Sequence, residues 1–154
     1  MMRKVSIAYA LKEKNRVAGR LAKARQLVNR ENSTDKRNPS VVDVRSVYND
    51  SKKLRDRLVA IKTTISVANQ PIVGKIVELA EVKSEISYLN SLDVKEGVFE
   101  SSVYGDKVRV TEITAVVTKK EVLDTVDALQ RRADQLQDEL DAFNASTKVE
   151  IEVD

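Results

Sequence analysis

Apolar residues recur along most of the chain at alternating steps of three and four, the spacing of one face of an α-helix. A polar segment at 31–40 and Pro71, which disfavours helical geometry in the preceding residue, interrupt the pattern. The second series is a coiled-coil seam made of Val44, Val47, Ser51, Leu54, Leu58, Ile61, Ile65 and Ala68. The pattern predicts helices over residues 5–30, 42–68, 73–92 and 118–144.

Two segments change to the two-residue period of a strand, residues 107–117 and 148–153. In the first, Val108 and Val110 are out of phase with Ile113, so we expect a bulge or bend near Thr111. Two lone strands do not form a stable sheet, so they must pair with each other, with helices or with other copies. A helix of about 26 residues spans about 39 Å and overshoots a strand of about 23 Å, which favours a homo-oligomer.

The composition supports a helical fold. A chain of 154 residues fits one domain, residues 1–154. Aromatic residues make up 4%, so the core must come from Leu, Ile, Val and Ala, which is typical of helical bundles. We expect a mainly α fold of long antiparallel helices, a coiled-coil-like bundle, with a small two-strand β element near the C-terminus.

The chain has no cysteine and no histidine, which removes disulfides, thiol nucleophiles, imidazole bases and the common zinc sites. We therefore expect that the protein is not an enzyme and that it has no catalytic residues, no cofactor and no metal. Asp134, Asp138 and Asp141 share one side of a helix and could hold Mg²⁺ or Ca²⁺. We interpret them as a solvated acidic face, because no second helix carries a matching acidic motif.

No stretch approaches the roughly 18 apolar residues that a membrane span needs, and the start, "MMRKVSIAYALKEKNR", is not a convincing signal peptide. We expect no membrane partner and a cytoplasmic location, which would be the host cytoplasm if the protein is phage-encoded.

Charge is distributed unevenly. Residues 1–62 hold 17 Lys/Arg and 6 Asp/Glu, net +11, whereas residues 63–154 hold 10 and 18, net −8. Basic and acidic helices could pack together within or between chains, the interpretation we favour, or the basic part could bind an external anion. Nucleic acid is not expected, because few aromatics accompany the basic residues and these ring their helices: Arg16, Arg20, Lys23, Arg25, Arg30, Lys52, Lys53, Arg55 and Arg57.

The residues of a candidate ligand site lie in the second half of the chain. Lys107 and Arg109 alternate on one face of a predicted strand, and Lys119 and Lys120 open the next helix. Basic side chains and free helix amides together could hold a small anion. The alternative is that the strand charges only discourage edge-to-edge aggregation, and both interpretations remain open.

Two consecutive arginines differ in their surroundings. Arg131 has Asp127 and Asp134 within one helical turn, a charge ladder that places it on the surface. Arg132 has no acid three or four residues away, so it needs a partner from another helix, another subunit or a ligand. We include Arg132 among the candidate ligand-binding residues.

Three stretches resemble the septicolysin-like family of small bacterial and phage proteins: "ALKEKNRVAGRLAKARQLVNR", "LRDRLVAIKTTISVANQ" and "VDALQRRADQLQDELDAFN". The strand "KVRVTEI" precedes the last of these. The resemblance covers nearly the whole chain and implies a fold and self-association more than a function. The haemolytic activity that the label suggests has no support in the sequence.

Two functions from different classes remain. The first is a non-enzymatic oligomeric binding protein that captures a small anionic, nucleotide-like ligand in basic pockets between helices or subunits. The second is a structural or scaffold protein, of phage origin or not, whose helices and strands serve only assembly.

Overall fold

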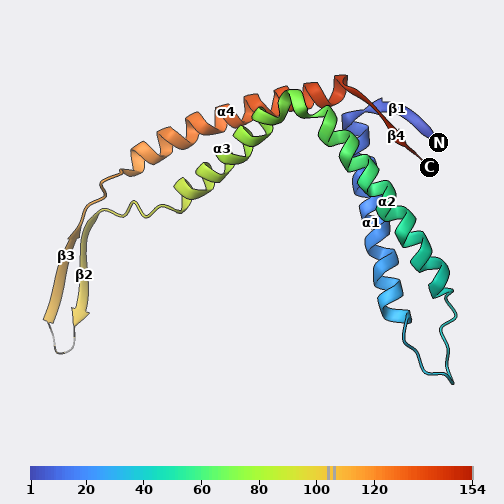
Figure 1. The fold of residues 1–154 in the computed structure, drawn as a ribbon. Coiled ribbons are helices and arrows are strands. Elements are labelled where there is room, and N and C mark those ends of the chain that lie inside the picture. The colour runs from blue at the N-terminus through green and yellow to red at the C-terminus, as the bar shows by residue number, and fades with distance from the viewer. Residues whose placement is uncertain (104, 106, 154) are drawn as a thin grey trace. The chain divides into compact units, whose positions relative to one another are not determined.

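A computed structural model describes residues 1–103, 105 and 107–153, and of Val103 and Lys107 it describes the backbone alone. The described chain is mainly helical, as predicted. Its α-helices are α1 (Ile7–Glu31), α2 (Val44–Ala68), α3 (Val73–Ser91) and α4 (Lys119–Ser146) (Figure 1). The contacts divide the chain into a first unit, Met1–Val73 with Leu140–Asp154, and a second unit, Gly74–Glu139.

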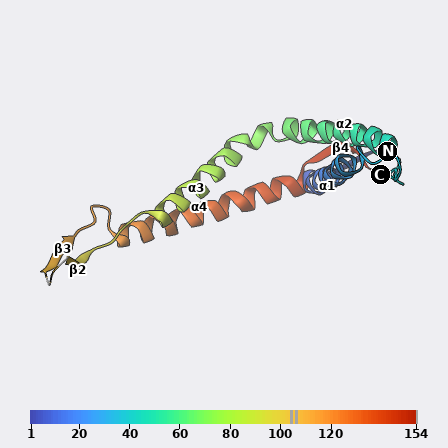
Figure 2. The ribbon, with the colours of Figure 1, turned by 90° about the horizontal axis from the view of Figure 1, so that it is seen from below.

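In the first unit, α1 and α2 run antiparallel and lie side by side in both ribbon views (Figures 1 and 2). Their facing seams are the ones that the three-and-four spacing predicts, and Ile7, Val17 and Ile61 are almost completely buried there. Each helix begins at a polar cap: Ser6 Oγ accepts from Tyr9 N–H at 3.2 Å, and Asp43 Oδ1 accepts from Ser46 N–H at 3.0 Å.

A two-stranded antiparallel sheet packs against α1 and α2. It joins β1 (Met2–Ser6) to β4 (Lys148–Glu152), with Val5 opposite Val149. The alternation predicted for residues 148–153 is confirmed, because Val149, Ile151 and Val153 are buried in the core with α1 and α2. The first helix therefore begins at Ile7 instead of Val5, since residues 2–6 pair with a strand far along the sequence.

α2 ends at Ala68, as the position of Pro71 predicts, and one 3₁₀ turn, η1 (Gln70–Ile72), leads into α3. In the second unit, α3 and α4 lie side by side, as both views show (Figures 1 and 2). Leu79 and Leu89 of α3 and Ala133 and Leu136 of α4 are buried. Apolar side chains are therefore buried along both helices of the second unit.

The second unit also contains a hairpin, in which β2 (Gly97–Val103) pairs antiparallel with β3 (Lys107–Ile113). The hairpin differs from the sequence-based expectation in three respects. β2 lies between residues 92 and 107, where the pattern predicts neither helix nor strand, and the strand predicted for 107–117 ends at Ile113. The register runs from Gly97 opposite Ile113 to Val103 opposite Lys107 without an extra residue, so no bulge lies near Thr111.

Candidate anion-binding site

The residues proposed from the sequence lie on two elements of the second unit. Arg109 is exposed on β3, opposite Ser101, and Lys107 belongs to the same strand, although its side chain lies outside the described residues. Lys119 and Lys120 are exposed in the first turn of α4, where Lys120 Nζ lies 2.7 Å from Asp124 Oδ2. Among the described side chains, no hydrogen bond or ion pair joins these residues to one another.

Arg132 has the partner that its sequence position requires. Its Nε donates to Glu78 Oε1 at 2.6 Å and its Nη2 to Glu78 Oε2 at 2.9 Å, a two-point pair between α4 and α3. The guanidinium holds the pKa of Glu78 below its ordinary value, chiefly through these hydrogen bonds. Arg132 also lies 12 residues beyond Lys120 on one helix, about 18 Å away, so the two do not contact one small anion.

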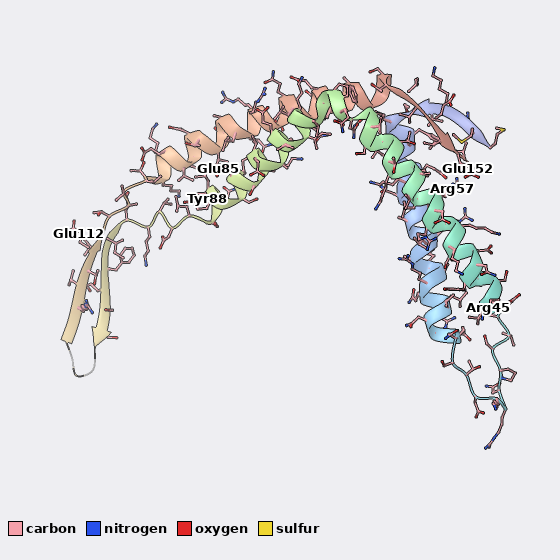
Figure 3. The ribbon with its side chains drawn as sticks, viewed as in Figure 1. Arg45, Arg57, Glu85, Tyr88, Glu112 and Glu152 are labelled. Atoms are coloured by element: carbon pink, nitrogen blue, oxygen red, sulfur yellow. The ribbon has the colours of Figure 1, made fainter. Side chains whose placement is uncertain are left out.

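A basic concavity lies in the first unit, between the C-terminal half of α1 and the N-terminal half of α2. We call it the basic hollow. Its volume is about 920 Å³, and it is lined by Arg25, Val28, Asn29, Asn32, Ser33, Val44, Arg45, Tyr48, Ser51, Lys52 and Arg55. Arg45 lies near the start of α2 (Figure 3). Four of the lining side chains are cationic and none is Asp or Glu.

The cations of the basic hollow are only partly neutralised. Arg55 donates to Asp56 Oδ1 at 2.7 and 2.8 Å. For Arg25, Arg45 and Lys52, the described part of the chain offers no ion pair. Like charges gathered without carboxylates repel one another, so an anion entering between them would lower the electrostatic free energy of the site.

Tyr48 lies between two of these cations. Lys52 Nζ is 4.3 Å from the centre of its ring and the Arg45 guanidinium carbon is 6.0 Å from it. Cation–π attraction of about 0.5–1 kcal/mol per exposed pair holds both charges near the ring. The basic hollow thus offers a phosphate positive groups beside an aromatic ring, and Val28 and Val44 add apolar side chains to its lining.

Sequence reasoning missed this site because it counted the basic residues around each helix separately. The useful signal is the spacing of Arg45, Tyr48, Lys52 and Arg55, at steps of three, four and three, which places them on one line along α2. Arg25 joins them only through the antiparallel packing of α1. Periodicity predicted that packing, but not which flank of the helix pair stays open.

A cluster of charged side chains, Glu13, Arg16 and Arg57, joins the elements of the first unit. Glu13 is buried, its Oε1 accepts from Arg57 Nη2 at 2.5 Å, and both of its oxygens accept from Arg16 at 2.7 and 2.9 Å. Arg57 also donates to the Glu152 carbonyl at 3.1 Å, which ties α2 to the sheet (Figure 3). A buried carboxylate held by two guanidinium groups has little capacity left for a ligand.

Within the described ranges, no cluster of three or more Asp or Glu side chains is placed to hold a metal ion. None of the described helices combines the length and apolar content that crossing a bilayer requires. The chain matches no family model, no curated protein and no solved structure. The resemblance to septicolysin-like proteins therefore stays a prediction.

Proposed function

We propose that the protein is a cytoplasmic, non-enzymatic, self-associating protein that binds a small, nucleotide-like anion in the basic hollow. One observation carries the proposal: Arg25, Arg45 and Lys52 face a common space without an acidic side chain among its lining residues. A volume of about 920 Å³ lies within the range of about 300–1,000 Å³ that is usual for small-molecule sites.

The charge of the whole first unit supports the same ligand class. Residues 1–73 and 140–154 hold 18 Lys/Arg and 10 Asp/Glu, net +8, and residues 74–139 hold 9 and 14, net −5. A concentrated positive charge attracts anions over a distance of about one Debye length and raises their local concentration. Nothing in the lining could act as an imidazole or thiol catalyst, because the chain has neither residue.

The test is calorimetric titration and thermal-shift measurement of the full chain with inorganic phosphate, pyrophosphate and a panel of nucleoside phosphates. A ligand at a hundredfold excess over its Kd stabilises the folded state by about 2.7 kcal/mol. Arg45→Ala and Lys52→Ala should each weaken binding roughly tenfold to a hundredfold, since a charge-assisted hydrogen bond contributes about 1.5–3 kcal/mol.

The matched control is Lys53→Ala. Lys53 is the neighbour of Lys52, but it lies outside the basic hollow and its Nζ lies 3.4 Å from Asp50 Oδ1. The control should bind as tightly as the parent chain. A flat response to the whole panel, or equal losses in Lys52→Ala and Lys53→Ala with unchanged helicity, would overturn the proposal and leave the scaffold alternative.

A further inference from the structure

α3 has an apolar face that packs toward α4 and a second, uncharged face that is exposed. The covered face contains Leu79, Val82, Ile86 and Leu89, which are buried or half-buried. On the opposite side, Val77, Ala80, Ser84 and Ser87 recur at steps of three and four, flanked by Ile76 and Tyr88. All six are exposed, and Val77 has 56% of its surface open. We call these six residues the α3 surface.

The α3 surface contains no charged residue, although one third of the chain is charged. Glu81 and Glu85 border it on one side and the exposed Lys83 borders it on the other, and Glu85 lies close to Tyr88 on α3 (Figure 3). Neither carboxylate has an ion pair with any described side chain. An uncharged face with two carboxylates along one border, on a unit with net charge −5, fits a partner that offers apolar side chains and a cation opposite that border.

The first unit carries a surface of that kind on α2. Val59, Lys62, Thr63, Ser66 and Val67 lie opposite the buried seam and are exposed; we call them the α2 surface. Residues 57–68 contain no Asp or Glu, and Lys62 makes no ion pair within the described structure. The α2 surface thus combines two exposed valines with an unpaired cation, on a unit of net charge +8.

We propose that the α3 surface of one copy docks on the α2 surface of a second copy. Charge complementarity selects this arrangement over the antiparallel pairing of two α3 surfaces by a two-fold axis. Antiparallel helices related by that axis bring the same flank of each copy together, so Glu81 and Glu85 would meet their own counterparts. Each copy carries both surfaces.

This contact gives the self-association in the proposed function a defined location, and it does not depend on ligand binding in the basic hollow. Light scattering and analytical ultracentrifugation of the full chain should show a dimer or larger assembly. Val77→Asp and Val59→Asp should each weaken association at least tenfold. The matched control is Val110→Asp on β3, which makes the same substitution at a valine with 60% of its surface open and should leave the mass unchanged.

The decisive experiment mixes the two variants. A Val59→Asp copy keeps an intact α3 surface and a Val77→Asp copy keeps an intact α2 surface, so the mixture should recover a mixed dimer that neither variant forms alone. If α3 paired with α3, Val59→Asp would associate normally. A monomer at all concentrations, normal association of Val59→Asp, or no recovery on mixing would each overturn the proposal. Circular dichroism confirms that the exposed substitutions leave the helices intact.

A charge exchange adds a second arm. Glu81→Lys with Glu85→Lys should weaken association and remove its sensitivity to salt, and adding Lys62→Glu should restore part of it. Unchanged association in the double variant would contradict the role of charge in selecting the partner. Because none of these residues lines the basic hollow, loss of association with normal anion binding separates this inference from the proposed ligand function.

Discussion

At the residue scale, Gly19 shows how a structure resolves an ambiguous sequence feature. A glycine in mid-helix indicates either close approach of a second helix or an unneeded loss of stability, and the sequence permits both. A Cβ built on Gly19 would meet nothing within 4 Å. The folded structure does not need a glycine here, and the greater conformational freedom of glycine in the unfolded chain lowers the stability of the folded state.

Gly19→Ala should accordingly stabilise the first unit by about 0.5–1 kcal/mol. Chemical denaturation followed by circular dichroism measures the change. Gly97→Ala is the contrasting variant, because Gly97 has a φ of +127° that only glycine adopts without strain, and it should be destabilised. A loss of stability in Gly19→Ala would contradict the open surroundings found at this position.

The pair of Arg132 and Glu78 gives stability a defined dependence on pH. The pKa of Glu78 is lower in the folded state, because Arg132 donates hydrogen bonds to its carboxylate. Its contribution is therefore fully present above the unfolded pKa of about 4.5 and is lost as the pH falls through the lower folded value. Glu78→Gln should be less stable than the parent chain at pH 7, and the difference should vanish in acid.

Equilibrium unfolding at a series of pH values tests this expectation. Glu96→Gln is the control, since Glu96 is exposed and makes no ion pair with the described residues. The free energy of unfolding of Glu96→Gln should differ from that of the parent chain by the same small amount at every pH. A stability difference for Glu78→Gln that persists unchanged to pH 2 would refute the assignment.

At the scale of elements, the four helices and the strands β3 and β4 were predictable, whereas β1 and β2 were not. All four predicted helices begin and end within two residues of those observed, because each carries a seam of three-and-four spacing. β1 was missed because Val5 is its one fully buried residue, and its partner β4 lies about 140 residues away. β2 was missed because "GVFESSV" is mostly polar and exposed.

The candidate site was likewise predictable from the sequence only in part. The need of Arg132 for a partner was readable from local spacing, because the absence of an acid within one turn is a property of one helix. The basic hollow depends on which flanks of α1 and α2 remain uncovered, which is a property of two helices together. Local sequence patterns therefore identify a charged residue that lacks a partner within its own helix more readily than they identify a cavity between two helices.

The N-terminus of α4 allows a test of one element alone. Thr118 N–H donates to Glu121 Oε2 at 2.8 Å, and Glu121 N–H donates to Thr118 Oγ1 at 3.3 Å, which is a capping box. Thr118→Ala should destabilise the helix by about 1 kcal/mol. Thr114→Ala, in the exposed connector before it, should change little. Hydrogen exchange of the first amides of α4 distinguishes the two, and equal protection in both variants would contradict the capping role.

At the scale of the whole molecule, the two compact units raise the question of cooperativity. Ile61→Ala removes core volume from the first unit and Leu136→Ala from the second, and such changes commonly cost about 2–5 kcal/mol. If each unit is stabilised mainly by its own core, hydrogen exchange should accelerate only in the unit that carries the substitution. Uniform acceleration across the chain in both variants would support the single domain predicted from the sequence.

The pairing of β1 with β4 has a consequence for the order of folding. The Met1 amino group donates to the Val153 carbonyl at 3.0 Å, and β1 pairs with residues that lie 142 to 150 positions further along the chain, so β1 is synthesised long before its partner strand. Residues 74–139 are all synthesised before β4. During translation α1 and α2 can pair early, while one edge of their core stays open to water and to chaperones. The first unit is thus begun first and completed last, and its closing step has the slow kinetics of a contact between distant parts of a chain.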